Sequence, residues 1–304
     1  MSISLTILGC GSATPTTKHH PTAQFLEIAE RFFLIDCGEG TQLQLRRFKL
    51  KFSKIDRILI SHMHGDHYFG LIGLLSSFHL LGRKKKMTII GPPDLERLLN
   101  LQFELSGTRP VFQIEFIPTQ TGERRLVWED KRVEVWTFPL RHSIQTTGFL
   151  FREKPKPRKI NRPACDRFEV PISAFNGIKE GQDFVTTSGE VIPNETLTFD
   201  PPTPRTYAFL SDTAFSPENI PFLKEVDLMY HESTFLKGDR ALAERTIHST
   251  TEDAAQMASR SKAGQLLIGH FSHRYEEETE YLREAEAIFP NTTLAHEGLR
   301  VTIE

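Results

Sequence analysis

The sequence contains little of what marks secreted, membrane-embedded or strongly basic proteins. Only three of its 304 residues are cysteines, at positions 10, 37 and 165, and none of them forms a C-x-x-C pair. Such a small, scattered set excludes a disulfide framework and favours a reducing compartment. No stretch approaches the roughly 20 apolar residues of a membrane span, and the N-terminus lacks the basic and apolar segments of a signal peptide. We therefore expect a cytoplasmic protein with no membrane partner.

An excess of positive charge is also absent. The chain has 37 Lys and Arg residues against 39 Asp and Glu residues, a formal net charge of -2 at pH 7. The overall charge therefore gives no sign of a nucleic-acid partner, although a local basic patch would be enough to bind one. One basic run, from Lys49 to Arg57, is compatible either with a solvated face or with contact to an RNA backbone. The length allows one large domain or two small ones.

One stretch concentrates the residues that carry chemistry. Residues 58–60 are apolar and predict the end of a buried strand, and the apolar, periodic run 68–81 predicts a helix. The turn between them carries His62, His64, Asp66 and His67. It would lie at the carboxyl end of a strand, where open α/β sheets place their sites. Imidazole and carboxylate groups bind zinc or, less commonly, manganese, iron or cobalt. Four ligands within six residues crowd a single tetrahedral ion, so we expect two ions that share the turn.

Later strand ends carry further candidates. Predicted strands over residues 133–138, 207–211 and 265–268 are followed by His142, Asp212 and His270. A carboxylate at such a strand end can bridge two metal ions. Elsewhere, residues 25–28 and 31–35 predict a hairpin, and a helix is expected over residues 251–262. The adjacent His19 and His20 in a polar loop are compatible with metal binding, but such histidines more often face solvent, so we expect these two to do so.

Residues 152–205 interrupt this alternation of strands and helices. Basic residues alternate with prolines there, which favours an extended, partly polyproline-like segment inserted into a single domain of residues 1–151 and 206–304. Residues 177–198 predict short strands and turns that return the chain to this domain. The segment is either a solvated linker or an arm that grips a polyanion through Lys and Arg. Its candidate RNA-binding residues are Arg152, Lys154, Lys156, Arg158, Lys159 and Arg162.

The run His62-x-His64-x-Asp66-His67 resembles the signature of the metallo-β-lactamase superfamily. The segments Ser211–Thr213, His231–Thr234, His248–Thr250 and His270–Tyr275 resemble, more narrowly, the short form of ribonuclease Z, a family of tRNA 3′-processing endonucleases. The resemblance extends from residue 3 to about residue 300. It implies an α/β fold, the four-layered αβ/βα sandwich of the metallo-β-lactamase type with an inserted basic arm.

The resemblance also implies roles for individual residues. His62, His64 and His142 would hold one zinc ion, Asp66, His67 and His270 the other, and Asp212 would bridge the two. Asp66 would also orient and deprotonate the attacking water. His248 would protonate or steady the leaving oxygen, and Glu232 would orient His248. Asp36 would support the ligand turn through hydrogen bonds rather than bind metal.

The function that follows from the resemblance is removal of the 3′ trailer from precursor tRNA. A hydroxide bridging two Zn²⁺ ions per subunit would attack the phosphodiester, leaving a 3′-hydroxyl on the tRNA and a 5′-phosphate on the trailer. Mn²⁺, Fe²⁺ or Co²⁺ are possible substitutes for zinc. The family also implies a homodimer, and no organic cofactor is expected.

The sequence departs from the family pattern in two places. The P-x-K-x-R-N loop lacks its Arg-Asn pair, because residues 15–20 read Pro-Thr-Thr-Lys-His-His, and this bears on rejection of tRNA that already carries CCA. The Gly-Pro element of the arm is missing from residues 170–177. Two other functions remain open: a metal-dependent hydrolase of small phosphodiesters or lactones, and a non-catalytic RNA-binding relative.

Overall fold

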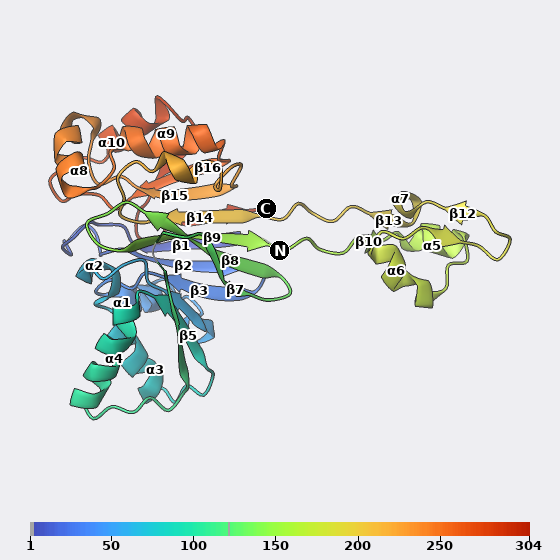
Figure 1. Cartoon of the computed structure of the whole chain (residues 1–304), viewed down its shortest axis with the longest axis horizontal. Coiled ribbons are helices and arrows are strands. Elements are labelled where there is room, and N and C mark those ends of the chain that lie inside the picture. Colours follow the sequence, from blue (N-terminus) through green and yellow to red (C-terminus); the bar gives the residue numbers. More distant parts are fainter. Residues whose placement is uncertain (1–2, 121) are drawn as a thin grey trace. The chain divides into compact units, whose positions relative to one another are not determined.

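The computed structural model describes residues 3–120 and 122–304. The chain divides into two compact units, one formed by the residues up to Arg152 together with Arg205–Glu304, the other by Glu153–Pro204. The larger unit is built on two seven-stranded sheets (Figure 1). Among the described residues, no helix has the length and apolar character needed to cross a membrane.

The first sheet contains mostly strands from the N-terminal half. In spatial order they are β18 (Arg300–Ile303), β1 (Ile3–Gly9), β2 (Ala23–Ile28), β3 (Arg31–Ile35), β4 (Arg57–Leu59), β5 (Met87–Gly91) and β6 (Ile114–Pro118). The predicted hairpin is confirmed as β2 and β3, which turn at Ala29 and Glu30 with φ values of 46° and 65°. Strands β3 to β6 run parallel, so their carboxyl ends meet at one edge of the sheet.

The second sheet contains strands from residues 125–294. In spatial order they are β17 (Thr292–Leu294), β16 (Gln265–Gly269), β15 (Leu228–Glu232), β14 (Thr206–Leu210), β9 (Thr146–Glu153), β8 (Val133–Leu140) and β7 (Arg125–Glu129). Strands β14 to β17 are parallel to one another, and β14 is antiparallel to β9. Strand β7 was not predicted; its half-buried residues lie at the sheet edge, where a strand buries little apolar surface.

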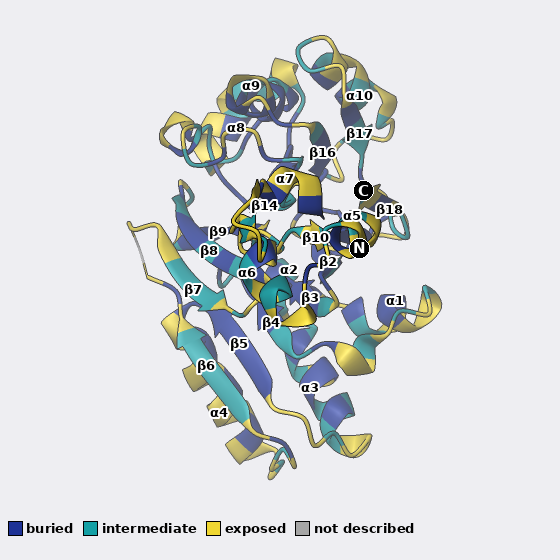
Figure 2. Ribbon diagram, turned by 90° about the vertical axis from the view of Figure 1, so that its right-hand side faces the viewer, coloured by how far each residue is buried: buried dark blue, intermediate teal, exposed yellow. Residues whose placement is uncertain are grey.

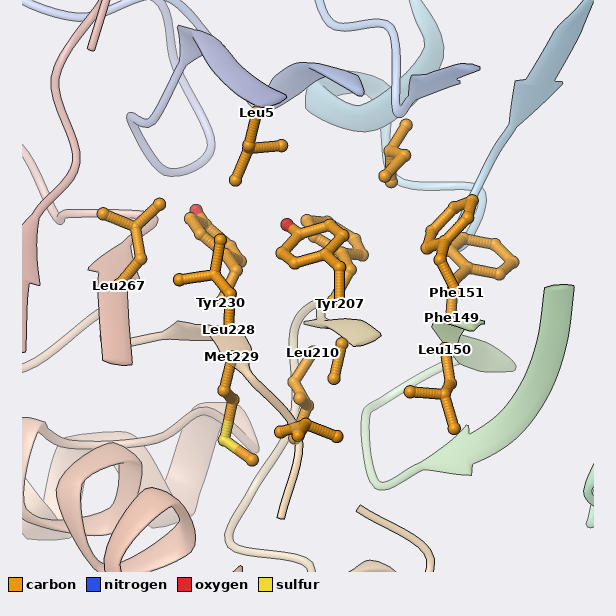
Figure 3. Close-up of a cluster of buried hydrophobic side chains, with 14 of the residues drawn as sticks. Leu5, Phe149, Leu150, Phe151, Tyr207, Leu210, Leu228, Met229, Tyr230 and Leu267 are labelled. Atoms are coloured by element: carbon orange, nitrogen blue, oxygen red, sulfur yellow. The ribbon is translucent and has the colours of Figure 1, made fainter. Parts of the chain in front are cut away.

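The inner faces of the two sheets pack against each other. Phe33 on β3 meets Phe151 on β9 edge-on, with ring centroids 5.1 Å apart. Tyr207 on β14 donates a hydrogen bond to the Gln24 side chain on β2. Figure 3 shows the side chains of the second sheet lined up below Leu5 of β1. Each large aromatic or aliphatic side chain buried here contributes roughly 1.5 to 3 kcal/mol of transfer free energy, so this layer dominates the stability of the larger unit.

Helices cover the outer faces of both sheets. Helices α3 (Leu71–Leu80) and α4 (Pro93–Leu105) bury leucines against the first sheet, and α9 (Thr251–Ser261) and α10 (Thr279–Glu286) pack on the second. In Figure 2 strand β5 is buried throughout, whereas α4 beside it is largely exposed. The expected four-layered sandwich is therefore confirmed. Helix α9 begins at the capping box of Thr250 and Asp253, close to the predicted start.

The helix predicted over residues 68–81 is confirmed as α3, although it begins three residues later than predicted. The structure has a short helix α2 (Gly65–Tyr68) and then a break before α3. At the break the amide of Gly70 donates to the carbonyl of Cys37 at 2.9 Å. A Cβ atom at Gly70 would lie 2.2 Å from the carbonyl oxygen of Gly38, so only glycine allows this approach. The break lets the turn after β3 press against the turn that carries Asp66 and His67.

The smaller unit has helices and a small core, which corrects the expectation of an extended, polyproline-like first part. The short strands expected over residues 177–198 are confirmed. The unit contains β10 (Lys159–Ile160), α5 (Arg162–Arg167), α6 (Phe175–Lys179), β11 (Phe184–Val185), β12 (Val191–Ile192), α7 (Asn194–Leu197) and β13 (Thr198–Phe199). Cys165, Val170, Ile178, Ile192 and Leu197 form its own small core. The buried amide of Asn194 donates to the carbonyls of Ile178 and Gln182 at 2.6 and 2.8 Å, and so ties the two halves of the unit together.

Positive charge is less dominant in the smaller unit than the prediction assumed. Residues 153–204 contain seven Lys and Arg residues but eight Asp and Glu residues. Arg158 pairs with Asp200 at 2.5 Å and Arg162 with Asp166 at 2.7 Å. The basic residues are concentrated before residue 168, and most of the acidic ones come after it. The first part of this unit is therefore basic and the second part is acidic, and the unit as a whole is not uniformly basic.

Candidate metal centre

The predicted ligand residues come together at the carboxyl ends of strands from both sheets. His62 and His64 follow β4, and Asp66 and His67 form the first turn of α2. His142 follows β8, Asp212 follows β14 and His270 follows β16. The structure therefore gathers all seven residues that the resemblance implied as ligands, from segments more than 200 residues apart.

The first group consists of three histidines. His64 Nδ1 lies 3.1 Å from His62 Nε2 and 3.2 Å from His142 Nε2. The Oδ2 atom of Asp212 lies 3.6 Å from His62 Nε2 and 3.8 Å from His142 Nε2. Three nitrogens and one oxygen with these separations match the edges of a tetrahedral zinc site.

The second group faces the other oxygen of the same carboxylate. Asp212 Oδ1 lies 3.4 Å from His67 Nε2 and 3.2 Å from His270 Nε2. Asp66 Oδ2 lies 3.4 Å from His67 Nε2 and 3.6 Å from His270 Nε2. Each oxygen of Asp212 thus belongs to one group, which is the arrangement of a carboxylate that bridges two ions.

Buried polar atoms in the second group have no hydrogen-bond partner among the described residues. They are His67 Nε2, His270 Nε2 and Asp212 Oδ1. Leaving a buried polar atom unsatisfied costs roughly 1 to 3 kcal/mol. A cation placed between these atoms would satisfy them together, and the nitrogen and oxygen donors are those that zinc accepts. The residues therefore fit a metal ion.

Hydrogen bonds behind the site orient the rings. His67 Nδ1 donates to Asp36 Oδ2 at 2.7 Å, and His142 Nδ1 donates to the carbonyl of Ile247 at 2.8 Å. His270 Nδ1 lies 2.8 Å from Thr234 Oγ1, and His62 Nδ1 lies 3.0 Å from Ser61 Oγ. With Nδ1 engaged, each of these rings turns Nε2 toward the centre.

Asp36 takes the supporting position expected of it. Besides His67 it accepts hydrogen bonds from the backbone amide and the hydroxyl of Ser61, at 2.8 and 2.9 Å. Its carboxylate is fully buried, and its backbone φ is 55°, an uncommon conformation for a non-glycine residue. The strained turn directs the carboxylate toward Ser61, which precedes His62, and toward His67. Asp36 therefore contacts both ligand groups, one through the neighbour of His62 and the other through His67.

Protonation states also suit metal binding. Burial lowers the pKa of His62 well below its ordinary value, and burial lowers the pKa of His64 and His142 as well, so these rings are neutral and can donate a lone pair. Burial opposes charge on His67 too, but the carboxylates of Asp212, Asp66 and Asp36 outweigh it and raise the pKa of His67 well above its ordinary value. The proton that His67 holds occupies the place a cation would take.

A second pair, Glu232 and His248, stands beside the ligands. Glu232 is fully buried at the end of β15, and its Oε1 lies 2.9 Å from His248 Nδ1. The same carboxylate accepts from the amides of Thr213, Thr234 and Ser249 at 2.9 to 3.0 Å. Burial opposes charge on His248, but the Glu232 carboxylate outweighs it and raises the pKa of His248 to about 9. His248 is therefore positively charged at neutral pH.

These groups open into one cavity of about 410 Å³. Its lining includes His64, Asp66, His142, Asp212, His248 and His270, together with Ser12, Ala13, Phe69, Ser143 and Thr246. The backbone amide of Ala13 donates to Asp66 Oδ2 at 2.9 Å. The loop after β1 is thus part of the site wall, and only the glycines at its start signalled this in the sequence.

His19 corrects another expectation. It was expected to face solvent, but it is only 8% exposed and contacts Cys10, Glu278 and Glu297. Glu278 and Glu297 are more than 250 residues away along the chain, so no local pattern could indicate their approach.

Fold and site together define a protein of the metallo-β-lactamase fold. The structure of a metallo-β-lactamase fold protein, YhfI from Bacillus subtilis, matches 99% of this chain and 100% of that chain with a TM-score of 0.69 at 17% identity. Human tRNase Z, short form, matches with a TM-score of 0.71 at 27% identity, covering 99% of each chain. A family model described as anti-Pycsar protein Apyc1 matches residues 3–153.

A curated relative identifies the family within this fold class. Ribonuclease Z of Bacteroides thetaiotaomicron is 48% identical over 98% of this chain and 95% of its own length. The chain therefore belongs to the ribonuclease Z family, and it is an enzyme of the ribonuclease class.

Replacing Asp36 by Asn should weaken metal binding. An amide keeps the size of the side chain but removes the charge that holds His67 Nδ1–H, so we expect the affinity of one ion to fall by about 10- to 100-fold. Titration of the metal-free protein with zinc, followed by calorimetry, measures the change. Asp94→Asn, on the exposed first turn of α4, is the matched control and should leave both affinities unchanged. Equal affinities in Asp36→Asn and the wild type would show that Asp36 does not support the centre.

Proposed function

We propose that this enzyme is a zinc-dependent endoribonuclease that removes the 3′ trailer from precursor tRNA. The products would be tRNA with a 3′-hydroxyl and a trailer with a 5′-phosphate. The observation that carries the proposal is the position of Asp212, whose two oxygens face two separate ligand groups within one open cavity. The names of the relatives, ribonuclease Z and human tRNase Z, support the substrate.

The proposed centre would hold two zinc ions per subunit. His62, His64 and His142 would hold one, Asp66, His67 and His270 would hold the other, and Asp212 would contribute to both. Manganese, iron or cobalt can replace zinc at sites of nitrogen and oxygen donors. Bound there, the ions would supply Lewis acidity to the scissile phosphodiester and lower the pKa of a nearby water.

Asp66 acts on the attacking water. Burial alone would raise the pKa of its carboxyl, but His67 and His270 outweigh burial and hold that pKa below its ordinary range, so the carboxylate is ionised. The amide of Ala13 and the two imidazoles fix its position on the cavity wall. An ionised, immobile carboxylate at this position orients a water molecule and accepts its proton.

His248 acts on the leaving oxygen. Its Nδ1 is engaged by Glu232, which leaves the Nε2 proton of the imidazolium as the one to be donated. His248 lines the same cavity as Asp66 and Asp212. Proton donation at Nε2 would neutralise the charge that builds on the tRNA 3′ oxygen as the bond breaks. Glu232 therefore positions His248 and stabilises its charged form.

Replacing Asp66 by Ala should abolish cleavage but not binding. Loss of a positioned general base lowers the rate by about 10²- to 10⁴-fold, whereas phosphate contacts elsewhere keep the affinity for tRNA. Single-turnover cleavage of a precursor tRNA and a filter-binding assay measure the two quantities. Retained turnover in metal-replete Asp66→Ala protein would contradict the role given to Asp66.

Replacing Glu232 by Gln should move the alkaline limit of activity to lower pH. The negative charge of Glu232 raises the pKa of His248 to about 9, and the acid form of His248 is lost as the pH rises through that value. Without the charge the pKa of His248 falls, so the rate declines from a lower pH. A pH profile of kcat/KM on wild type and variant measures the shift. An unchanged alkaline limb, or one moved to higher pH, would contradict the role of the pair.

The basic segment that starts at the last residue before the smaller unit and continues into that unit would bind tRNA. The proposed contacts are Arg152, Lys154, Lys156, Arg158, Lys159 and Arg162. Replacing residues 153–204 by a short Gly-Ser linker should weaken tRNA binding and lower the salt dependence of affinity, because each lost phosphate contact removes about one unit of the slope. Turnover of a small aryl phosphodiester should persist. An unchanged rate on precursor tRNA would contradict the role given to the smaller unit.

We also propose a homodimer. The support is the family, in which the inserted arm reaches tRNA held by a partner subunit. Light scattering at micromolar protein concentration should give twice the mass of the 34.8 kDa chain. A monomeric mass under conditions in which the enzyme cleaves precursor tRNA would rule out a required dimer.

A further inference from the structure

A second group of metal-ligand residues lies outside the centre described above. Cys10 follows β1, His19 lies on the loop between β1 and β2, and Glu297 lies on the turn before β18. Gly11 makes this approach possible, since a Cβ atom there would lie 2.9 Å from the Cβ of His19. Cys10 is fully buried, and the side chains of His19 and Glu297 are only 10% and 12% exposed.

The three side chains present a thiol, an imidazole and a carboxylate to one point. Cys10 Sγ lies 3.4 Å from His19 Nδ1, His19 Nδ1 lies 3.0 Å from Glu297 Oε2, and Cys10 Sγ lies 3.9 Å from Glu297 Oε1. Zinc bonds of about 2.0 to 2.3 Å at tetrahedral angles separate neighbouring ligands by roughly 3.3 to 3.8 Å. Shifts of a few tenths of an ångström would therefore bring all three atoms to coordination distance.

The other nitrogen of His19 is held by a fourth side chain. His19 Nε2 lies 2.5 Å from Glu278 Oε1, which is also 2.7 Å from Lys18 Nζ. A histidine that binds metal usually donates its second N–H to a carboxylate, and this bond selects the tautomer. In His19, a proton on Nε2 that is donated to Glu278 would leave the lone pair of Nδ1 directed at Cys10 and Glu297.

We propose that Cys10, His19 and Glu297 form a third metal site, which binds zinc in a structural role. A cavity of about 270 Å³, lined by Gly11, Ser12, His19 and Glu278 among others, adjoins the group. Of the three ligand residues, His19 lines this cavity and Cys10 and Glu297 do not, so an ion would enter past His19.

The third site stabilises the wall of the dinuclear centre. The loop that it closes also donates from the amide of Ser12 to the carbonyl of Phe271 at 3.0 Å, and from the amide of Ala13 to Asp66 Oδ2 at 2.9 Å. Phe271 directly follows the ligand His270. An ion at Cys10 would thus fix the loop that positions Asp66, without touching the reacting atoms.

Cobalt substitution separates the third site from the dinuclear centre. None of the seven residues assigned to the dinuclear centre is a cysteine, so a thiolate-to-cobalt charge-transfer band in the near ultraviolet reports on a cysteine outside that centre. We expect the band in the cobalt-loaded full-length enzyme, and about three metal ions per chain by elemental analysis of the zinc form. Cys10→Ser should lose the band and about one ion per chain.

Two further variants complete the test. Cys165→Ser, in the core of the smaller unit, is the matched control and should keep the band and the third ion. His64→Ala should lose metal from the dinuclear centre but keep the band, which distinguishes failure of that centre from failure of the third site. If Cys10→Ser does not fold, Glu297→Gln should weaken zinc binding at the third site and shift the band. Two ions per chain and no thiolate band in the wild type would overturn the proposal and leave His19 as an ion-pair residue only.

Discussion

The carboxylate of Asp212 is the group on which the rest of the structure depends. It is almost completely buried, and burial alone would raise its pKa, yet the imidazoles of His270, His67 and His62 hold that pKa well below its ordinary value. A buried charge of this kind is tolerable only among opposite charges or metal ions. Three strand ends and one helix turn converge on this residue, so the positions of the ligands follow from the need to surround one anion.

Both sheets contribute ligand residues around Asp212. The first sheet brings in His62, His64, Asp66 and His67 on a single turn, and the second brings in His142, Asp212 and His270. The aromatic layer between the sheets, with Phe33 against Phe151, keeps the two halves in register. Ser61 joins them at the site itself, since its hydroxyl contacts both Asp36 and Ser211 at 2.9 Å. Packing far from the cavity therefore determines distances of a few ångströms inside it.

The sequence predicted the site correctly where the end of a strand determines the position of a ligand residue. Apolar runs predicted strands before the ligands at His142, Asp212 and His270, and the dense cluster after β4 needed no tertiary information. The prediction failed where distant backbone decides the outcome. The helix break at Gly70 exists because the carbonyls of Cys37 and Gly38 pass beside it. The burial of His19 depends on Glu278 and Glu297. The small core of residues 153–204 draws its apolar residues from spacings too irregular to show a period.

Cleavage of a 3′-extended precursor tRNA, with both product ends mapped and a chelator-treated sample run in parallel, tests the account most directly. The account predicts a single cut that leaves a 3′-hydroxyl on the tRNA and a 5′-phosphate on the trailer. Chelation should abolish the cut, and added zinc should restore it. A cut that survives complete metal removal would contradict the dinuclear centre. No cut by a metal-replete enzyme that hydrolyses a small aryl phosphodiester would contradict the proposed substrate.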